Sequence, residues 1–299
     1  MACAAHVIVV DGPADAGRHA RLRLEELERR WSRFLPESDV SRLNGSPEAM
    51  LVVAPDTVRL VATMQHAWRV TGGRYDPTLL AAINAAGYAE SVDGSGRASS
   101  RPHGSRQGHD VDDVRVHESA PLVGVPSGLG LDPGGIGKGL AADIVVRELL
   151  EQGASGALVG IGGDLACAGA PPEPHGWRIA VEDPFESSRP LTTVALAAGG
   201  AATSSTLTRT WESDGERRHH VIDPSSGACA STDLAAVTVF ARAGWEAEVH
   251  ATAAILAGSA GALAYLRRAG LSGIVTTLGG VTTSTPGLDP ADMTEWSAA

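Results

Sequence analysis

The sequence predicts a mixed α+β fold, because it carries both helical and strand-like patterns of apolar residues. Between residues 18 and 34, apolar side chains recur at spacings of three and four with charged residues between them, which is typical of an amphipathic helix. Short apolar runs at residues 7–10, 157–161 and 234–240 indicate strands. The length of 299 residues suits one large domain or two closely packed ones, and no internal repeat is evident.

The first part of the sequence contains two predicted helices separated by a polar loop. The helix at residues 18–34 runs into residues 32–45, where hydroxyl and amide groups are dense. This density fits recognition of a polar ligand, although such residues also cap and turn backbones for structural reasons. The second helix begins at Pro55 and ends at Gly72-Gly73.

Two distinctive segments follow the second helix. Pro77 disfavours helix at Asp76, so that Tyr75, Asp76 and Thr78 are presented together. From residue 90 to residue 113 the composition turns to Ser, Gly, Arg, His and Asp, which predicts a flexible surface insertion. We expect its histidines, His103 and His109, to be solvated rather than to bind a metal.

The most informative stretch is residues 129–143, LGLDPGGIGKGLAAD, which predicts a strand, a glycine-rich loop and a helix in succession. Exposed backbone groups in the loop and the partial positive charge at the helix start suit a phosphate or diphosphate. Lys138, in the loop, is the only lysine of the protein. The stretch is not a P-loop, because Asp132 and Gly139 stand where that motif needs glycine and a hydroxyl residue. A structural turn with a solvent-exposed lysine is the alternative interpretation.

Candidate ligand contacts recur in the second half of the sequence. The strand at residues 157–161 leads into residues 162–164, Gly-Gly-Asp, where backbone can approach a ligand closely, and short strands are expected at residues 177–181 and 191–196. Residues 201–206 contain four hydroxyl side chains, and Arg209 follows them. His220 stands just before an Asp-Pro turn and is a candidate acid, base or phosphate contact.

The last predicted helix, residues 245–256, carries Glu248 and Thr252 four residues apart on one face. A carboxylate and a hydroxyl are suitable oxygen ligands for Mg2+, which binds few protein oxygens together with substrate phosphates. A solvated surface contact is the alternative for this pair. After a strand at residues 273–278, we expect the domain to end at residue 287 and residues 288–299 to form a tail.

Composition and charge exclude several classes of function. The net charge of −11 argues against a surface for nucleic acid or anionic membrane, since counterion release needs clustered Lys and Arg. No apolar run approaches the length of a membrane span, and neither a signal peptide nor a lipid-anchor motif is seen. The three cysteines form no spaced pair, which predicts a reduced, cytoplasmic protein.

Taken in order, these segments resemble the FAD:protein FMN transferases, the ApbE family, from about residue 26 to residue 278 with a gap at residues 90–113. Each motif is weak by itself, but six of them occur in register. The matching blocks are residues 32–44 (SRFLPESDVSRLN), 71–78 (TGGRYDPT), 134–143 (GGIGKGLAAD), 162–164 (GGD), 203–209 (TSSTLTR) and 220–227 (HVIDPSSG).

The resemblance implies Mg2+-dependent transfer of the FMN part of FAD to a threonine hydroxyl of an acceptor flavoprotein, with release of AMP. By position, it implies that the backbone carbonyl of Gly137 binds the metal together with Glu248 and Thr252, and that His220 and Glu248 are catalytic. It also implies two unequal halves of mainly antiparallel sheet flanked by helices around a central cleft. The residues that it implies for binding of FAD are Ser38, Asn44, Tyr75, Asp76, Thr78, Gly135, Lys138, Asp143, Gly163, Asp164, Ser204, Arg209 and His220.

Several positions depart from the pattern of the family. Glu248 stands where aspartate is usual, and its side chain is one methylene longer. Because Mg2+ tolerates little geometric error, a shift of the helix or backbone would have to absorb this difference. Gly137 stands where alanine is usual, and Ser205 and Leu207 replace a glycine and a tyrosine. Two alternatives therefore stay open, namely hydrolysis of FAD to FMN and AMP and binding of FAD without catalysis. Metal-dependent turnover separates catalysis from binding alone.

Overall fold

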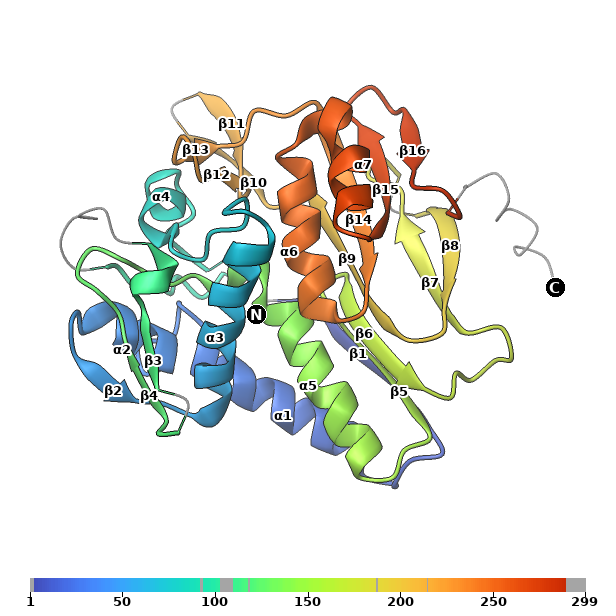
Figure 1. The fold of residues 1–299 in the computed structure, drawn as a ribbon, viewed down its shortest axis with the longest axis horizontal. Coiled ribbons are helices and arrows are strands. Elements are labelled where there is room, and N and C mark those ends of the chain that lie inside the picture. The colour runs from blue at the N-terminus through green and yellow to red at the C-terminus, as the bar shows by residue number, and fades with distance from the viewer. Residues whose placement is uncertain are drawn as a thin grey trace. The chain divides into compact units, whose positions relative to one another are not determined.

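The structure is a computed structural model that describes residues 3–91, 94–102, 110–117, 119–186, 188–213 and 215–288. His103, His109 and residues 289–299 of the predicted tail lie outside the described residues. The protein divides into two compact units, which Figure 1 shows as a ribbon. Within the described residues, the first unit contains residues 22–137 and 210–230, and the second contains residues 3–21, 138–209 and 231–288.

The centre of the second unit is a seven-stranded sheet in which every neighbouring pair is antiparallel, in the order β1-β5-β6-β9-β14-β15-β16. Several of its strands consist mainly of alanine, leucine, valine and glycine and are buried along most of their length. The strands are β1 (Ala5–Val10), β5 (Gly156–Ile161), β6 (Asp164–Gly169), β9 (Gly199–Ser205), β14 (Leu234–Ala241), β15 (Ser272–Thr277) and β16 (Thr282–Ser284).

Both faces of this sheet are covered, because consecutive residues of a strand point to opposite faces and β14 is buried from Leu234 to Phe240. A hairpin of β7 (Trp177–Glu182) and β8 (Pro190–Leu196) packs on one face through an apolar cluster that includes Trp177, Phe240 and Ala201. Helices α6 (Gly244–Ile255) and α7 (Gly258–Arg268) contact β9, β14 and β15. The third helix of this unit is α5, which begins at its border with the first unit and spans Gly137–Glu151.

Strand β9 shows how the two faces are divided. Ala201 contributes to the cluster beneath the hairpin, whereas its neighbours Gly200 and Ser204, at even positions, approach helix α6. A polar residue at an even position of β9 therefore faces α6, which is the helix that carries Glu248 and Thr252.

The first unit combines short helices with three small sheets. Helix α1 (Ala16–Trp31) enters it at residue 22, and its other helices are α2 (Asp39–Gly45), α3 (Pro55–Val70) and α4 (Leu80–Ala85), with short 3-10 turns at Val111–Asp113 and Pro133–Gly135. The sheets are β2 (Met50–Val52) with β4 (Leu122–Gly124) and β3 (Arg115–His117), β10 (Thr210–Ser213) with β11 (Glu216–His219), and β12 (Ile222–Asp223) with β13 (Ala228–Cys229).

The predicted α+β class and the mainly antiparallel sheets are confirmed, while several local predictions are wrong. Residues 39–45 form helix α2 instead of a loop, because Ser38 caps it by accepting the Ser41 N–H. Lys138 is the second residue of helix α5 rather than part of a loop. The insertion at residues 90–113 stays a prediction as a whole, and of its described residues, Ser91 and Ser99 donate their backbone N–H groups to the carbonyls of Arg97 and Ala89, and Ser99 is buried.

Candidate functional site

In the second unit, glycines allow the starts of helices α5 and α6 to approach strand β9 very closely. A Cβ atom on Gly139 would lie 2.3 Å from the carbonyl carbon and oxygen of Gly244. A Cβ atom on Gly200 would lie 2.4 Å from the N and Cα atoms of the same Gly244. Real Cβ atoms do not approach backbone so closely, so only glycine fits at these two positions. The first turns of both helices are thereby brought together beside the strand.

Asp143 fixes the N-terminus of α6. Its Oδ1 accepts the Gly244 N–H at 2.7 Å and its Oδ2 accepts the Trp245 N–H at 3.0 Å. Ala243, at the N-cap position of α6, makes no such bond through its methyl group. The family resemblance implies that Asp143 binds FAD, which stays a prediction, and in this structure its carboxylate positions the helix that carries Glu248 and Thr252.

A buried group of opposite charges lies where α5, α6 and β6 meet. The ammonium of Lys138, on α5, donates to Oδ2 of Asp164, at the start of β6, and to Oε1 of Glu248, on α6, the latter at 2.6 Å. Glu248 Oε2 accepts the Gly139 N–H at 2.8 Å. The exposed fractions of the side chains are 14% for Lys138, 4% for Asp164 and 5% for Glu248. Three predicted site residues that are distant in the sequence are therefore in direct contact.

The pKa values of this group reflect its burial. Burial raises the pKa of the Glu248 carboxyl to about 7, and the charge of Asp164 adds to the rise while Lys138 opposes it. Burial alone would lower the pKa of Lys138, but the charges of Asp164 and Glu248 outweigh that effect and raise it above its ordinary value. Lys138 therefore stays charged at neutral pH, whereas Glu248 changes its charge near neutrality.

Two hydroxyl groups lie near the backbone of Glu248, and a backbone N–H contacts Asp164. Thr252, one turn after Glu248 on α6, donates to the Glu248 backbone carbonyl at 3.3 Å and lies 3.1 Å from the Ser204 hydroxyl on β9. The Thr203 N–H donates to Asp164 Oδ1 at 3.2 Å. Carboxylate and hydroxyl oxygens thus gather from α6, β6 and β9, and this is the ligand chemistry that hard cations prefer.

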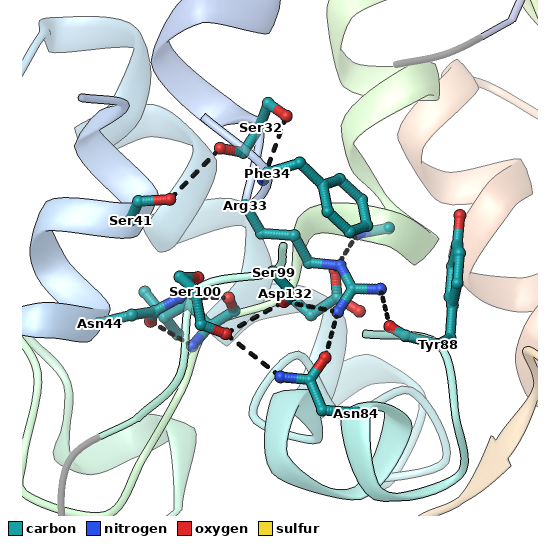
Figure 2. A network of polar contacts seen from close by, with 12 residues as sticks. Ser32, Arg33, Phe34, Ser41, Asn44, Asn84, Tyr88, Ser99, Ser100 and Asp132 are labelled. Carbon is teal, nitrogen blue, oxygen red and sulfur yellow. Dashed lines mark hydrogen bonds and ion pairs between the residues drawn. The ribbon is translucent and has the colours of Figure 1, made fainter. Parts of the chain in front are cut away.

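In the first unit, Arg33 is the centre of a second polar network, which Figure 2 shows. The guanidinium donates to Asn84 Oδ1 at 2.9 Å, to the Ser99 hydroxyl at 3.0 Å and to the Tyr88 carbonyl at 3.0 Å. Asp132 lies 3.6 Å from its Nε, and Arg33 is only 4% exposed. Arginine suits this position, because its planar fork can reach several acceptors at once.

Aromatic rings enclose the same guanidinium. Its central carbon lies 4.5 Å from the ring centroid of Phe34 and 4.8 Å from that of Tyr88, as for cation–π contacts. Tyr88 in turn stacks on Trp211 with ring centroids 5.6 Å apart, and the Trp211 indole donates to the Ala86 carbonyl at 2.7 Å. The network therefore ties the end of α1 to the segment after α4 and to β10.

Two of the residues expected to bind FAD, Ser38 and Asn44, support helix α2 and its surroundings. Ser38 donates to the Ser32 carbonyl at 2.7 Å as well as capping α2. Asn44 is buried, donates to Leu131 O and to the Ser100 hydroxyl, and accepts the Leu131 N–H at 2.7 Å. Asn44 thus joins α2 to the backbone that precedes the glycine-rich segment.

The segment at residues 75–78 forms a local turn. Asp76 Oδ1 accepts the N–H of Thr78 at 2.8 Å and its hydroxyl at 2.5 Å, as in an Asx turn. The Pro77 carbonyl accepts the Asp132 N–H at 2.8 Å, which joins this turn to the start of the glycine-rich segment. Tyr75 is buried, with 4% of its surface exposed.

The remaining predicted residues lie in turns or at the ends of elements. Gly135 ends a 3-10 turn and Gly163 lies in the β5–β6 turn with a φ of +97°, where glycine is favoured. Arg209 follows β9 with a φ of +48°, and His220 stands between β11 and β12. Gly137 is the first residue of α5 and directly precedes Lys138.

Two features of these sites have little or no signal in the sequence. The first is the set of hydrogen bonds that Arg33 donates to Asn84, Ser99 and Tyr88. In the sequence, only the pair Arg33-Phe34 at the end of a helix points to this network. The ion pairs of Lys138 are the other. A lone lysine retained among 23 arginines does indicate that its ammonium has a particular task, but not which partners it has.

The family model described as "ApbE family" matches residues 1–275, which is most of the protein. The chain belongs to the ApbE family. Among curated relatives of this ApbE protein, the FAD:protein FMN transferase of Treponema pallidum is 33% identical over 51% of the chain and 47% of the relative. The FAD:protein FMN transferase of Escherichia coli K12 is 35% identical over 46% of the chain and 39% of the relative. These matches thus span less than half the length of either relative.

Solved ApbE structures share the fold over almost the whole length. The flavinyl transferase ApbE of Pseudomonas stutzeri matches with a TM-score of 0.76 and 26% identity, over 96% of each protein. The ApbE protein of Thermotoga maritima matches with a TM-score of 0.78 and 23% identity, over 94% of this protein and 92% of that one. The α+β architecture described above is therefore the ApbE architecture.

Two kinds of feature are absent from the described residues of this ApbE protein. No described helix is both long and apolar enough to cross a membrane. Nor do three or more His, Cys, Asp or Glu residues of the described ranges form a group that could hold a metal ion. The predicted metal ligands include a backbone carbonyl and a hydroxyl, so they belong to a different kind of site.

Proposed function

We propose that this ApbE protein is a magnesium-dependent flavin transferase, which moves the FMN part of FAD to a threonine hydroxyl of an acceptor flavoprotein and releases AMP. The observation that carries the proposal is the buried contact of Lys138 with Asp164 and Glu248 in the second unit, with Thr252 one turn after Glu248 on the same helix. Membership of the ApbE family and the names of the relatives support the reaction class.

The chemistry of the buried group fits Mg2+. Its donors are the carboxylate oxygens of Glu248 and the hydroxyl of Thr252, to which the family pattern adds the Gly137 carbonyl. Mg2+ prefers oxygen ligands and usually takes only one or two carboxylates, leaving other positions for water and phosphate. In this structure the Glu248 carboxylate already binds one cation, the ammonium of Lys138, and it also accepts the Gly139 N–H.

In the proposed reaction, the residues of the protein mainly position groups and balance charge. Glu248 and Thr252 would hold Mg2+, which would neutralise charge on the diphosphate. The threonine oxygen of the acceptor forms a bond to the phosphorus of the FMN part, and the bond from that phosphorus to the oxygen shared with AMP breaks. We propose that His220 accepts the proton of the threonine hydroxyl, on the basis of its position in the family motif alone.

We propose that FAD contacts side chains and backbone groups in turns and at strand ends. Tyr75, Asp76 and Thr78 offer an aromatic ring and a polar turn, and Ser204 offers a hydroxyl beside Thr252. Gly135, Gly163 and Arg209 lie in turns or at the end of a strand, where backbone and a guanidinium suit phosphate. Lys138, Asp164 and His220 keep their proposed contacts with FAD. Ser38, Asn44 and Asp143 are also proposed to contact FAD, and in addition they hold their own elements in place.

Release of AMP from FAD by the purified protein tests the function. We expect AMP release that needs Mg2+ and a threonine-bearing acceptor domain, together with covalent flavin fluorescence on the acceptor. The variants Glu248→Gln and Thr252→Val are expected to lower the rate by about 100-fold or more, because each removes a proposed metal ligand. Glu246→Gln on the same helix is the matched control, since the Glu246 carboxylate accepts the Arg242 N–H just before the helix.

The alternatives give different results in the same assay. AMP release in Mg2+ without any acceptor indicates hydrolysis of FAD to FMN and AMP. Binding of FAD without AMP under any condition, with several acceptors tested, indicates a protein that binds FAD only. Either result contradicts the proposed transfer.

The place of the reaction in the cell is part of the proposal. The cysteines Cys3, Cys167 and Cys229 are all free, which supports a reducing compartment such as the cytoplasm. The acceptor is proposed to be a flavoprotein that presents a threonine. A protease-protection assay on intact cells tests the location.

A further inference from the structure

The proposed metal ligand Glu248 is already bonded to a cation, the ammonium of Lys138. Oε1 of Glu248 accepts from Lys138 at 2.6 Å, and Oε2 accepts the Gly139 N–H at 2.8 Å. Among the described residues these two donors are the partners of that carboxylate. A divalent cation that binds to Oε1 must therefore share this oxygen with the ammonium or replace it.

Sharing is unfavourable in this environment. Lys138 and Glu248 have side chains that are 14% and 5% exposed, so water screens their charges weakly. An ammonium and a dication on one oxygen would bring positive charges almost into contact, and their repulsion would be large. The geometry therefore makes the two cations competitors for Oε1.

Asp164 offers the ammonium an alternative place. Its Oδ2 is also bonded to Lys138, and its Oδ1 accepts the Thr203 N–H at 3.2 Å. The second bond attaches the Asp164 carboxylate to the β6–β9 strand pair, whereas the Glu248 carboxylate is held by helices α5 and α6. Lys138 can thus leave Glu248 and still keep a buried partner on another element.

We propose that Lys138 is the built-in counter-cation of the metal site, which neutralises Glu248 when no metal is bound, yields Oε1 to the entering divalent cation and stays on Asp164. The inference rests on the proposed function, because it takes Glu248 as a metal ligand. Asp164 is then a positioning residue that acts through Lys138, and the metal affinity is set by a competition within the protein.

The single lysine of the protein makes the exchange directly observable. In protein labelled with 15N-lysine, only one lysine ammonium can give a signal, that of Lys138. We expect titration with Mg2+ to shift this signal, and the shift to saturate at the same concentration as the binding isotherm from calorimetry. The Glu248→Gln protein should show no Mg2+-induced shift, and the Glu246→Gln protein should behave like the wild type.

Substitutions of the two partners should change the Mg2+ affinity in opposite directions. Lys138→Gln removes the competitor and is expected to tighten Mg2+ binding by about tenfold or more near pH 8. Lys138→Arg keeps a competing charge and should stay near the wild-type affinity. Asp164→Asn removes the alternative partner, holds the ammonium on Glu248 and is expected to weaken binding by about tenfold. A merely structural role of these residues would weaken binding in all three variants.

The outcomes separate this inference from the proposed function. Mg2+ binding in calorimetry with an unchanged Lys138 signal overturns the inference and leaves the proposed function standing. A folded Lys138→Gln protein that binds Mg2+ more weakly than the wild type does the same. Absence of Mg2+ binding to the wild type, with and without FAD, overturns both. If Lys138→Gln does not fold, the wild-type titration alone decides.

Discussion

Glu248 combines a buried carboxylate with a proposed role as a metal ligand. Because burial raises its pKa to about 7, a proton would compete with the proposed metal for this carboxylate near neutral pH. A cation needs the ionised form of the carboxylate, which dominates above that pKa, so the affinity for the cation should rise with pH. Lys138 does not change its charge in this range, because the two carboxylates raise its pKa above the ordinary value despite its burial.

We therefore predict that Mg2+ binding weakens as the pH falls through about 7, by up to tenfold per pH unit where one proton is displaced. Calorimetric titrations of the wild type with Mg2+ at about pH 8, 7 and 6 measure this dependence. Glu246→Gln should show the same profile as the wild type. An affinity that is equal at about pH 8 and 6 contradicts the prediction.

Arg33 differs from Glu248, because its charge is permanent and its partners all belong to the protein. Removing it leaves Asp132 without its buried counter-charge and the amide oxygen of Asn84 without its donor, in addition to the lost contacts with two aromatic rings. We predict that Arg33→Ala lowers the free energy of unfolding by about 3 kcal/mol. Urea denaturation followed by circular dichroism measures the loss.

A surface arginine provides the control for this prediction. Arg69 pairs with Asp112 at 2.7 Å, but its side chain is 55% exposed, so Arg69→Ala should change stability by less than about 1 kcal/mol. Equal losses for the two variants would mean that the enclosure of Arg33 adds nothing to the stability of the first unit.

At the residue scale, the sequence indicates single residues better than their partners. Helical periodicity alone predicts Glu248 and Thr252 on one face, and the structure puts both on α6. The partners of Lys138 lie 26 and 110 residues away, and no local pattern contains such separations. These contacts come from tertiary packing of α5, β6 and α6, which a single sequence does not reveal.

At the scale of elements, the contact between α5 and α6 depends on glycine rather than on large apolar residues. Gly139→Ala would place its Cβ 2.3 Å from backbone atoms of Gly244, and backbone has no free rotation to relieve such a clash. We predict that Gly139→Ala lowers the free energy of unfolding by about 3 kcal/mol and weakens Mg2+ binding, since α6 must move. Thermal unfolding and calorimetry check the two parts.

Gly17, in helix α1, is the matched control for this substitution. A Cβ on Gly17 would meet no atom within 4 Å, so Gly17→Ala should be neutral or stabilising by up to about 1 kcal/mol through the higher helix propensity of alanine. If both substitutions had the same small effect, the close packing of α5 on α6 would not be needed.

Elements that are rich in glycine and other small residues are the ones that the sequence does not predict. Strand β9, Gly-Gly-Ala-Ala-Thr-Ser-Ser, has weak strand propensity, and it is a strand because its neighbours β6 and β14 pair with it and α6 needs its glycine. Helix α7, which spans Gly258–Arg268, also contains glycine and small residues that carry no clear helical signal. Long apolar patterns, as in α1 and β14, predict bounds close to the observed ones.

At the scale of the whole molecule, burial lowers the pKa of a described histidine in each unit. His219, in the first unit, interacts through Nε2 with the Ala230 carbonyl, and its pKa is lowered although that hydrogen bond opposes the shift. His250, in the second unit, pairs through Nδ1 with the Tyr265 hydroxyl at 2.7 Å, and burial lowers its pKa. Both are thus held in the neutral form.

Buried neutral histidines make the folded protein lose stability as the pH falls. Below the ordinary histidine pKa of 6.5 the unfolded state gains protons that the folded state does not bind, so their contribution to stability is complete above 6.5 and is lost as the pH falls. Glu248 acts in the opposite direction, because its raised pKa lets the folded state bind a proton first.

We predict that the double variant His219→Gln, His250→Asn loses less stability than the wild type between about pH 7.5 and 5.5, measured by urea denaturation. The exposed His175→Gln should leave the wild-type loss unchanged. An equal loss in the double variant and the wild type would mean that other groups, and not these two histidines, govern the response to acid.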